Sequence, residues 1–187
     1  MSVGESRLPA GWSPSRQYET EAKVFRLSHL RKMRGCEQVA AVCFRVRRRR
    51  IEFLLVQTRG GHWIFPKGSA EPGLTNAQAA ALEAFEEAGV HGRIEEASFA
   101  RYVRRRVVEF RDAPIEITTS AYLCEVSRLD PPPEANRNPS WFSPEKAKRR
   151  LREERAQEYA AELIRVIDRA VTRIDLAGLV EGRRKAG

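Results

Sequence analysis

The sequence predicts an α/β fold in which a mixed sheet is packed between helices. Three observations lead to this: two strand-like segments near residue 40, a capped helix after them, and a second strand-rich region followed by an amphipathic helix. Strands and helices that alternate in this way favour layers, with helices covering the faces of a sheet. We therefore expect an α/β/α sandwich.

The length of 187 residues suits one domain with a sizeable buried core. Residues 1–35 lack strong periodicity, and the chain ends in a short basic segment. We therefore expect an N-terminal extension over residues 1–35, the domain over residues 36–175 and a basic C-terminal tail over residues 176–187.

Charge and cysteine content restrict the classes of function. The formal net charge of +9 attracts polyanions such as phosphorylated ligands, nucleic acid or acidic membranes. Cys36, Cys43 and Cys124 have neither Cys-x-x-Cys spacing nor a paired framework, which argues against a disulfide scaffold or a zinc cluster. No apolar run has the length of a signal peptide or a membrane span. We expect a cytoplasmic protein that does not enter a membrane.

The first two expected strands form a hairpin. Residues 38–46 and 51–58 are rich in β-branched and aromatic residues, and the four consecutive arginines 47–50 lie between them. The hairpin therefore has an arginine tip. A glycine-rich connection over residues 59–68 then leads into a short apolar piece that Pro66 and Gly68 end.

The clearest local signal is a helix over residues 76–88. Thr75 and Gln78 have the spacing of a capping box, and Gly89 lies where a helix C-terminus favours glycine.

The second half of the chain alternates between strand and helix signals. Residues 93–110 and 115–126 read as strands separated by a turn at residues 112–114. After the three prolines 131–133, Ser143 as N-cap and Pro144 at the first helical position start one final helix. Its later part should bury a row of apolar residues: Leu163, Val166, Ile167, Ala170 and Ile174.

Three carboxylates are expected on one face of the helix at residues 76–88. Glu83, Glu86 and Glu87 stand at i, i+3 and i+4, which brings their side chains together near the negative end of the helix. Their mutual repulsion costs a few tenths of a kcal/mol per pair, roughly, and a hard divalent cation such as Mg²⁺ would reverse it. The alternative is a solvated acidic face.

The wider pattern resembles the Nudix box. Gly68 matches its first glycine, Glu83 and the pair Glu86-Glu87 match its metal-binding glutamates, and Gly89 matches its end. The usual first Glu and the usual Arg are replaced by Leu74 and Leu82. The resemblance runs over residues 39–170 and looks closest to the branch of the diphosphoinositol polyphosphate phosphohydrolases.

The resemblance implies a Nudix hydrolase that uses Mg²⁺ or Mn²⁺ to cut a diphosphate linkage. Candidate substrates are nucleoside diphosphate derivatives, dinucleoside polyphosphates and diphosphoinositols. It assigns catalysis to Glu83, Glu86 and Glu87, and metal binding to the same residues together with the Gly68 carbonyl.

Basic residues near the proposed site suit phosphate oxygens. We expect Arg45, Arg59 and Lys67 to bind the substrate, with Lys67 as the best single phosphate contact. The arginines of the hairpin tip are more simply a solvated tip. The expected partner is a phosphorylated small molecule, and nucleic acid is a less favoured one.

Several alternatives stay open at this point. The replaced box positions also fit a non-catalytic Nudix-like module that binds a nucleotide or a sugar diphosphate, and the arginine-rich strands fit an RNA-binding protein. His62 and His91 belong to no cluster with metal-ligand spacing. Other candidate carboxylates are Glu71 as a substitute in the loop before the helix, and a late residue that completes the metal site: Glu109, Glu116 or Glu125.

Overall fold

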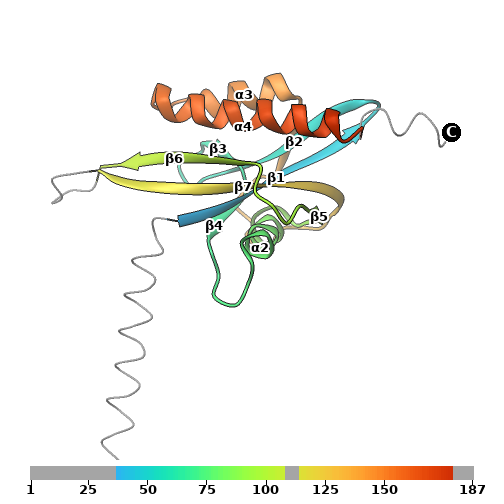
Figure 1. Ribbon diagram of the computed structural model, residues 1–187, viewed down its shortest axis with the longest axis horizontal. Helices are drawn as coiled ribbons and strands as arrows, with labels where there is room; N and C mark the ends of the chain where they lie inside the picture. The colour runs from blue at the N-terminus through green and yellow to red at the C-terminus, as the bar shows by residue number, and fades with distance from the viewer. Residues whose placement is uncertain (1–36, 108–113, 179–187) are drawn as a thin grey trace, which may run out of the picture. The chain divides into compact units, whose positions relative to one another are not determined.

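The computed structural model describes residues 37–107 and 114–178 (Figure 1). The predicted extension over residues 1–35, Cys36, Glu109, residues 112–113 of the predicted turn and the end of the predicted tail lie outside this part of the chain. The strands are β1 Glu37–Arg47, β2 Arg50–Gln57, β3 Trp63–Ile64, β4 Lys67–Ser69, β5 Val90–Ile94, β6 Ala100–Arg106, β7 Ile115–Leu129 and β8 Ser140–Phe142. The helices are α2 Asn76–Ala88, α3 Pro144–Arg152 and α4 Gln157–Leu176.

The strands form a mixed sheet. Its main path runs β3-β2-β1-β7-β5, with β4 paired to β1, β6 to β7 and β8 to β2. Strands β1 and β7 are parallel, whereas the other pairings are antiparallel. The central strand β1 is fully buried over residues 39–44 because neighbours and helices cover it on both sides and both faces.

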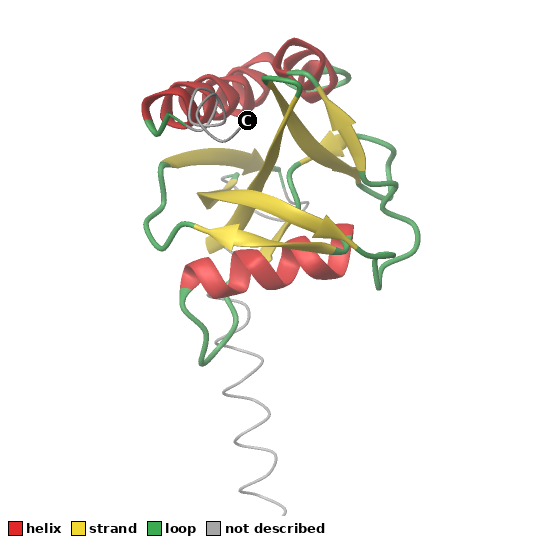
Figure 2. Ribbon diagram, turned by 90° about the vertical axis from the view of Figure 1, so that its right-hand side faces the viewer, coloured by secondary structure: helices red, strands yellow, loops and turns green. Residues whose placement is uncertain are grey.

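Helices cover the sheet from two sides. Helix α2 lies against one side, and α3 and α4 lie together on the other (Figures 1 and 2). The predicted apolar row of α4 is buried throughout, and so it supplies the core on its side. The predicted α/β/α sandwich with a mixed sheet is confirmed.

Helix α2 begins and ends where the local signals predict. The Thr75 side chain accepts a hydrogen bond from the Gln78 backbone N–H at 3.2 Å, and the Gln78 side chain accepts one from the Thr75 N–H at 2.9 Å. Gly89 ends the helix with φ 65°, a left-handed conformation in which glycine has no Cβ penalty. These caps fix the register of the carboxylate face.

The hairpin between β1 and β2 also lies where it was predicted. Arg47 pairs with Arg50, and the two residues between them, Arg48 and Arg49, both have positive φ. A two-residue hairpin of this kind requires that conformation at both positions. The arginine tip is exposed.

The prediction of one final helix was wrong. The chain leaves the helix after Arg152, turns at Glu154 with φ 53° and resumes as α4. The Arg155 guanidinium holds this break, because it donates to the Leu151 carbonyl at 2.8 Å and to the Trp63 carbonyl at 2.5 Å. Strand β8 was not predicted either, since Ser140–Phe142 is short and gains its order by pairing with β2.

No described helix combines the length and the apolarity that crossing a bilayer requires.

Candidate functional site

The three glutamates of α2 differ in burial. Glu87 is only 3% exposed, whereas Glu83 and Glu86 are half-buried. Since Glu83 and Glu87 are one turn apart, they share a face of α2, and this face lies against the loop that carries β4. The site therefore begins as one buried and two partly open carboxylates.

Gly68 in β4 makes room for the Glu83 carboxylate. A Cβ at position 68 would lie 1.7 Å from the Glu83 Oε1 and 2.2 Å from its Cδ, distances that no side chain tolerates. The absence of a side chain at position 68 thus allows the Glu83 carboxylate to lie against the backbone of β4, and a Cβ here would displace that carboxylate. The structure brings together the first glycine and the first glutamate that the sequence pattern selected.

Both oxygens of the Glu87 carboxylate are bound by the protein. Oε2 accepts a hydrogen bond from the Lys67 backbone N–H at 3.2 Å, and Oε1 lies 2.6 Å from the Arg137 Nη2. A buried carboxylate needs such partners to stay charged. Arg137 was not among the residues that the sequence pattern selected.

A fourth carboxylate, Glu134, joins the cluster from the loop between β7 and β8. Its backbone N–H donates to the Glu86 carbonyl at 2.9 Å, and its side chain binds the Arg137 Nε at 2.6 Å. The Asp130 N–H likewise donates to the Gly89 carbonyl at 2.8 Å. The loop therefore runs along the C-terminal end of α2 and satisfies carbonyls that the helix leaves free.

Two of the late acidic residues predicted from the sequence, Glu116 and Glu125, form ion pairs away from the carboxylates of α2. Glu116 pairs with Arg105 at 3.0 Å and Glu125 pairs with Arg93 at 3.1 Å, all on the strands. The run of three prolines before Glu134 predicts a loop, but no sequence signal indicates that this loop reaches α2.

Burial and repulsion shift the acidity of the cluster. Burial, followed by the charges of Glu87, Glu86 and Glu134, raises the pKa of Glu83 to about 7. Burial also raises the pKa of Glu87, although the nearby Arg137 opposes this shift. Glu83 has no hydrogen bond or ion pair with any described residue, and so its negative charge is less compensated than that of Glu87.

Of the predicted phosphate contacts, Lys67 is the one beside the carboxylates. Its Nζ donates to the Gln38 Oε1 at 2.9 Å, and burial lowers the pKa of its ammonium group while the charge of Glu87 raises it. Arg45 is held 4.1 Å over the Trp141 ring and 2.7 Å from Glu52. Arg59 is exposed in the loop between β2 and β3 and bonds to no described residue.

Other residues singled out from the sequence lie outside the cluster. Glu71 and Leu74 are exposed in the loop before α2, and Leu82 is half-buried. His62 lies 3.7 Å from Glu154, and His91 bonds to Asp130 at 2.9 Å. Neither histidine belongs to a group that could hold a metal ion among the described residues.

The donor set fits a hard divalent cation in its chemistry. Four carboxylates surround one end of α2, with Arg137 and Lys67 as the nearby cations that oppose them. Carboxylate oxygens are the ligands that Mg²⁺ and Mn²⁺ prefer. Within the described part of the chain, no three acidic, histidine or cysteine side chains already converge on one point, and both oxygens of Glu87 are bound by Arg137 and the Lys67 N–H.

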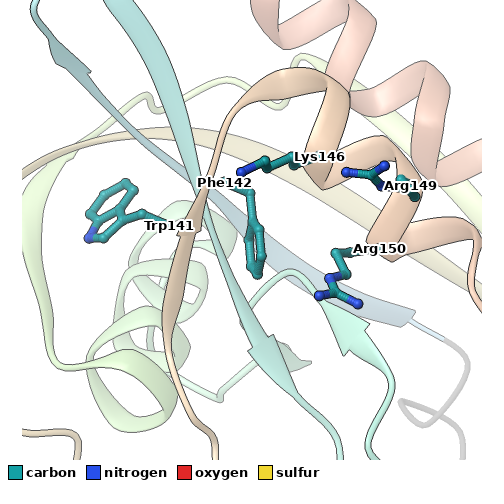
Figure 3. Close-up of a pocket in the computed structure, with 5 residues that line it drawn as sticks. All are labelled: Trp141, Phe142, Lys146, Arg149 and Arg150. Carbon is teal, nitrogen blue, oxygen red and sulfur yellow. The ribbon is translucent and has the colours of Figure 1, made fainter.

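A separate cavity of about 440 Å³ lies beside α3 (Figure 3). It is lined by Trp141, Phe142, Lys146, Arg149 and Arg150. The Trp141 ring points away from the three basic side chains, and Arg150 is bonded to Glu153 at 3.1 Å. None of the four carboxylates lines this cavity, which belongs to the side of the sheet that α3 and α4 cover.

A family model described as the NUDIX domain matches residues 37–165. Among solved structures, the C. elegans Ap4A hydrolase superposes with a TM-score of 0.50 at 23% identity, over 74% of this chain and 98% of that one. A NUDIX hydrolase from Nitrosomonas europaea gives 0.56 at 19%, over 73% and 88%. The NUDIX domain of Shewanella oneidensis NrtR, solved with ADP ribose, gives 0.54 at 17%, over 74% and 87%. At these identities the superpositions show a shared fold.

Proposed function

Because the chain belongs to the NUDIX domain family, we propose that it is a hydrolase that cuts a diphosphate linkage with the help of Mg²⁺ or Mn²⁺. The observation that carries the proposal is the contact of Glu83 with Gly68 at the end of a helix that also presents Glu86 and Glu87. A solvated acidic face, the alternative to a site, would not bury Glu87 at 3% exposure.

The residues have different parts in this reaction. Glu87, whose carboxylate is positioned by Arg137 and the Lys67 N–H, is one proposed metal ligand. Glu83, which lies against Gly68 on the same face of α2, is the proposed group that accepts a proton from the attacking water. Glu86 and the Gly68 carbonyl complete the proposed ligand set. When bound, the divalent ion supplies positive charge that offsets the charge of the diphosphate oxygens.

The bond changes balance without a covalent intermediate. A water oxygen forms a bond to phosphorus, the bridging P–O bond breaks, and the proton of the water passes to Glu83. Two phosphorylated products leave. Lys67, whose ammonium group lies beside the carboxylates, is the proposed phosphate contact.

The proposed substrates carry two or more linked phosphates. Dinucleoside polyphosphates and nucleoside diphosphate derivatives are supported by the names of two proteins of similar fold, the Ap4A hydrolase and the NrtR domain solved with ADP ribose. Diphosphoinositols are supported by the resemblance of the sequence to that branch. The positive net charge favours any of these polyanions.

A panel assay tests the proposal. Phosphate and nucleotide release would be measured with Mn²⁺ or Mg²⁺ on dinucleoside polyphosphates, nucleotide sugars, nucleoside triphosphates, capped RNA and diphosphoinositols. We expect turnover of at least one class, and its loss in Glu83→Gln and Glu87→Gln. The matched control is Glu116→Gln on β7, which should retain turnover. Leu82→Arg should not raise it.

A non-catalytic binding module is the second candidate. The leucines at positions 74 and 82, together with a Glu87 that the protein already neutralises, favour it. Calorimetry on the same panel separates the two, because a binding module would take up a nucleotide and return it unchanged. Clean metal binding without turnover of any compound would overturn the hydrolase proposal.

A further inference from the structure

The Arg137 guanidinium bridges two carboxylates of the proposed site. Its Nη2 lies 2.6 Å from the Glu87 Oε1, and its Nε lies 2.6 Å from the Glu134 Oε2. The Arg137 side chain is 25% exposed, and so the contact with the buried Glu87 is largely sheltered from water, whereas the contact with Glu134, which is 49% exposed, is not. Charge-assisted bonds of this length are among the stronger polar contacts in proteins.

The backbone of Arg137 is anchored to the sheet. Its carbonyl accepts a hydrogen bond from the Gln57 N–H at 2.6 Å, and the Asn138 side chain donates to the Gln57 Oε1 at 3.0 Å. Asn138 itself has φ 46°, a conformation that asparagine tolerates better than most residues. The base of the arginine is therefore fixed to β2, while its long side chain alone reaches the carboxylates.

The remaining carboxylates have no such partner. The side chains of Glu83 and Glu86 make no hydrogen bond or ion pair with any described residue. The positive charge of Arg137 thus lies beside Glu87 and Glu134, while the carboxylates of Glu83 and Glu86 are left without a bonded partner among the described residues. A divalent ion that binds all of them must compete with Arg137 for Glu87 and Glu134.

We propose that Arg137 is a tethered cation that competes with the divalent ion for Glu87 and Glu134 and gives way when the ion binds. This inference rests on the proposed function, since it concerns the same site. Its consequence is that Arg137 weakens the affinity of the resting site for metal. Anything that draws the guanidinium away, such as a substrate phosphate, will strengthen metal binding, because the two events share one competitor.

Titration of the whole protein with Mn²⁺ alone tests the competition. Calorimetry should show that Arg137→Gln binds Mn²⁺ about tenfold tighter than the wild type, because the variant no longer offers a competing charge-assisted bond. Arg137→Lys should fall between the two, since an ammonium group cannot form the same fork to two carboxylates. Arg93→Gln removes an exposed arginine that pairs with Glu125 and should match the wild type.

A second readout does not depend on metal. In EDTA, Arg137→Gln should lower the melting temperature, because it leaves Glu87 buried without its cation. Adding Mn²⁺ should then raise the melting temperature of the variant by more than it raises that of the wild type. If Arg137→Gln does not fold, Arg137→Lys carries the affinity comparison. Equal or weaker Mn²⁺ binding in the folded variant overturns the proposal.

The outcomes separate this proposal from the proposed function. If the wild type hydrolyses a substrate with Mn²⁺ while the Arg137 variants bind the ion no tighter, only the competition falls. If neither the wild type nor any variant binds Mn²⁺ at millimolar concentrations, both fall.

Discussion

Glu83→Gln should stabilise the metal-free protein at alkaline pH. The pKa of Glu83 is raised from 4.5 to about 7, chiefly by burial and then by Glu87 and Glu86. A carboxyl with a raised pKa in the folded state favours folding below its unfolded pKa, and this contribution is lost as the pH rises through the folded value. The wild type should therefore lose stability between pH 4.5 and about pH 8, and the variant should not share this loss.

The magnitude follows from the shift. A rise of about 2.5 pKa units corresponds to about 3 kcal/mol for a fully buried group, and solvent around the half-buried Glu83 reduces this to about 1–2 kcal/mol. Part of the penalty is already present at pH 5, because the unfolded carboxyl is mostly ionised there. The advantage of Glu83→Gln over the wild type should thus grow by about 1 kcal/mol between pH 5 and pH 8.

Urea unfolding in EDTA at the two pH values measures this difference. Glu116→Gln, on an exposed carboxylate of β7, is the control and should show no such growth. Added Mn²⁺ should stabilise the wild type more than Glu83→Gln, because a ligand that binds only the folded state raises stability by an amount that grows with the logarithm of its affinity. A difference that stays constant with pH, or that shrinks toward pH 8, would refute the electrostatic reasoning.

Three further substitutions distinguish residues that matter for metal binding from residues that matter for the stability of the fold. Gly68→Ala should leave stability within about 1 kcal/mol, since only the end of the Glu83 side chain must move, yet calorimetry should show Mn²⁺ affinity at least tenfold lower. Gly89→Ala should cost at least about 2 kcal/mol in urea unfolding, because its φ is 65° and a Cβ would lie 1.8 Å from the Asp130 carbonyl oxygen. Arg155→Ala removes two hydrogen bonds to backbone carbonyls and should cost about 2–3 kcal/mol in the same assay, with turnover per folded molecule unchanged.

The fold was predictable where local chemistry determines it. Thr75, Gln78 and Gly89 define both ends of α2 without reference to the rest of the chain, and the structure has the helix at those bounds. The break between α3 and α4 was not predictable, because residues 153–156 contain neither glycine nor proline. It depends on Arg155 reaching a carbonyl of β3, which is a tertiary contact.

The residues of the candidate site were likewise predictable only in part from the sequence. Helical spacing alone brings Glu83, Glu86 and Glu87 to one end of α2, and the family resemblance adds Gly68. Glu134 and Arg137 were missed, because their roles arise from the path of the loop between β7 and β8, which hydrogen bonds to the last turn of α2 determine. A loop rich in proline and polar residues carries no periodic signal for such a path.

The glutamates of α2 look alike in the sequence, but they differ in burial, in hydrogen-bond partners and in pKa in the folded protein. Glu87 is buried and bound by two donors, and so its carboxylate has a fixed position. Glu83, one turn earlier, occupies the space that Gly68 leaves, and burial followed by the charges of the neighbouring carboxylates raises its pKa to about 7. Like charges at the negative end of a helix oppose folding, and the capping box, the αL glycine and the loop that covers the last turn offset that cost. The same face of the helix thus holds one carboxylate in a fixed position and another whose pKa lies near neutral pH.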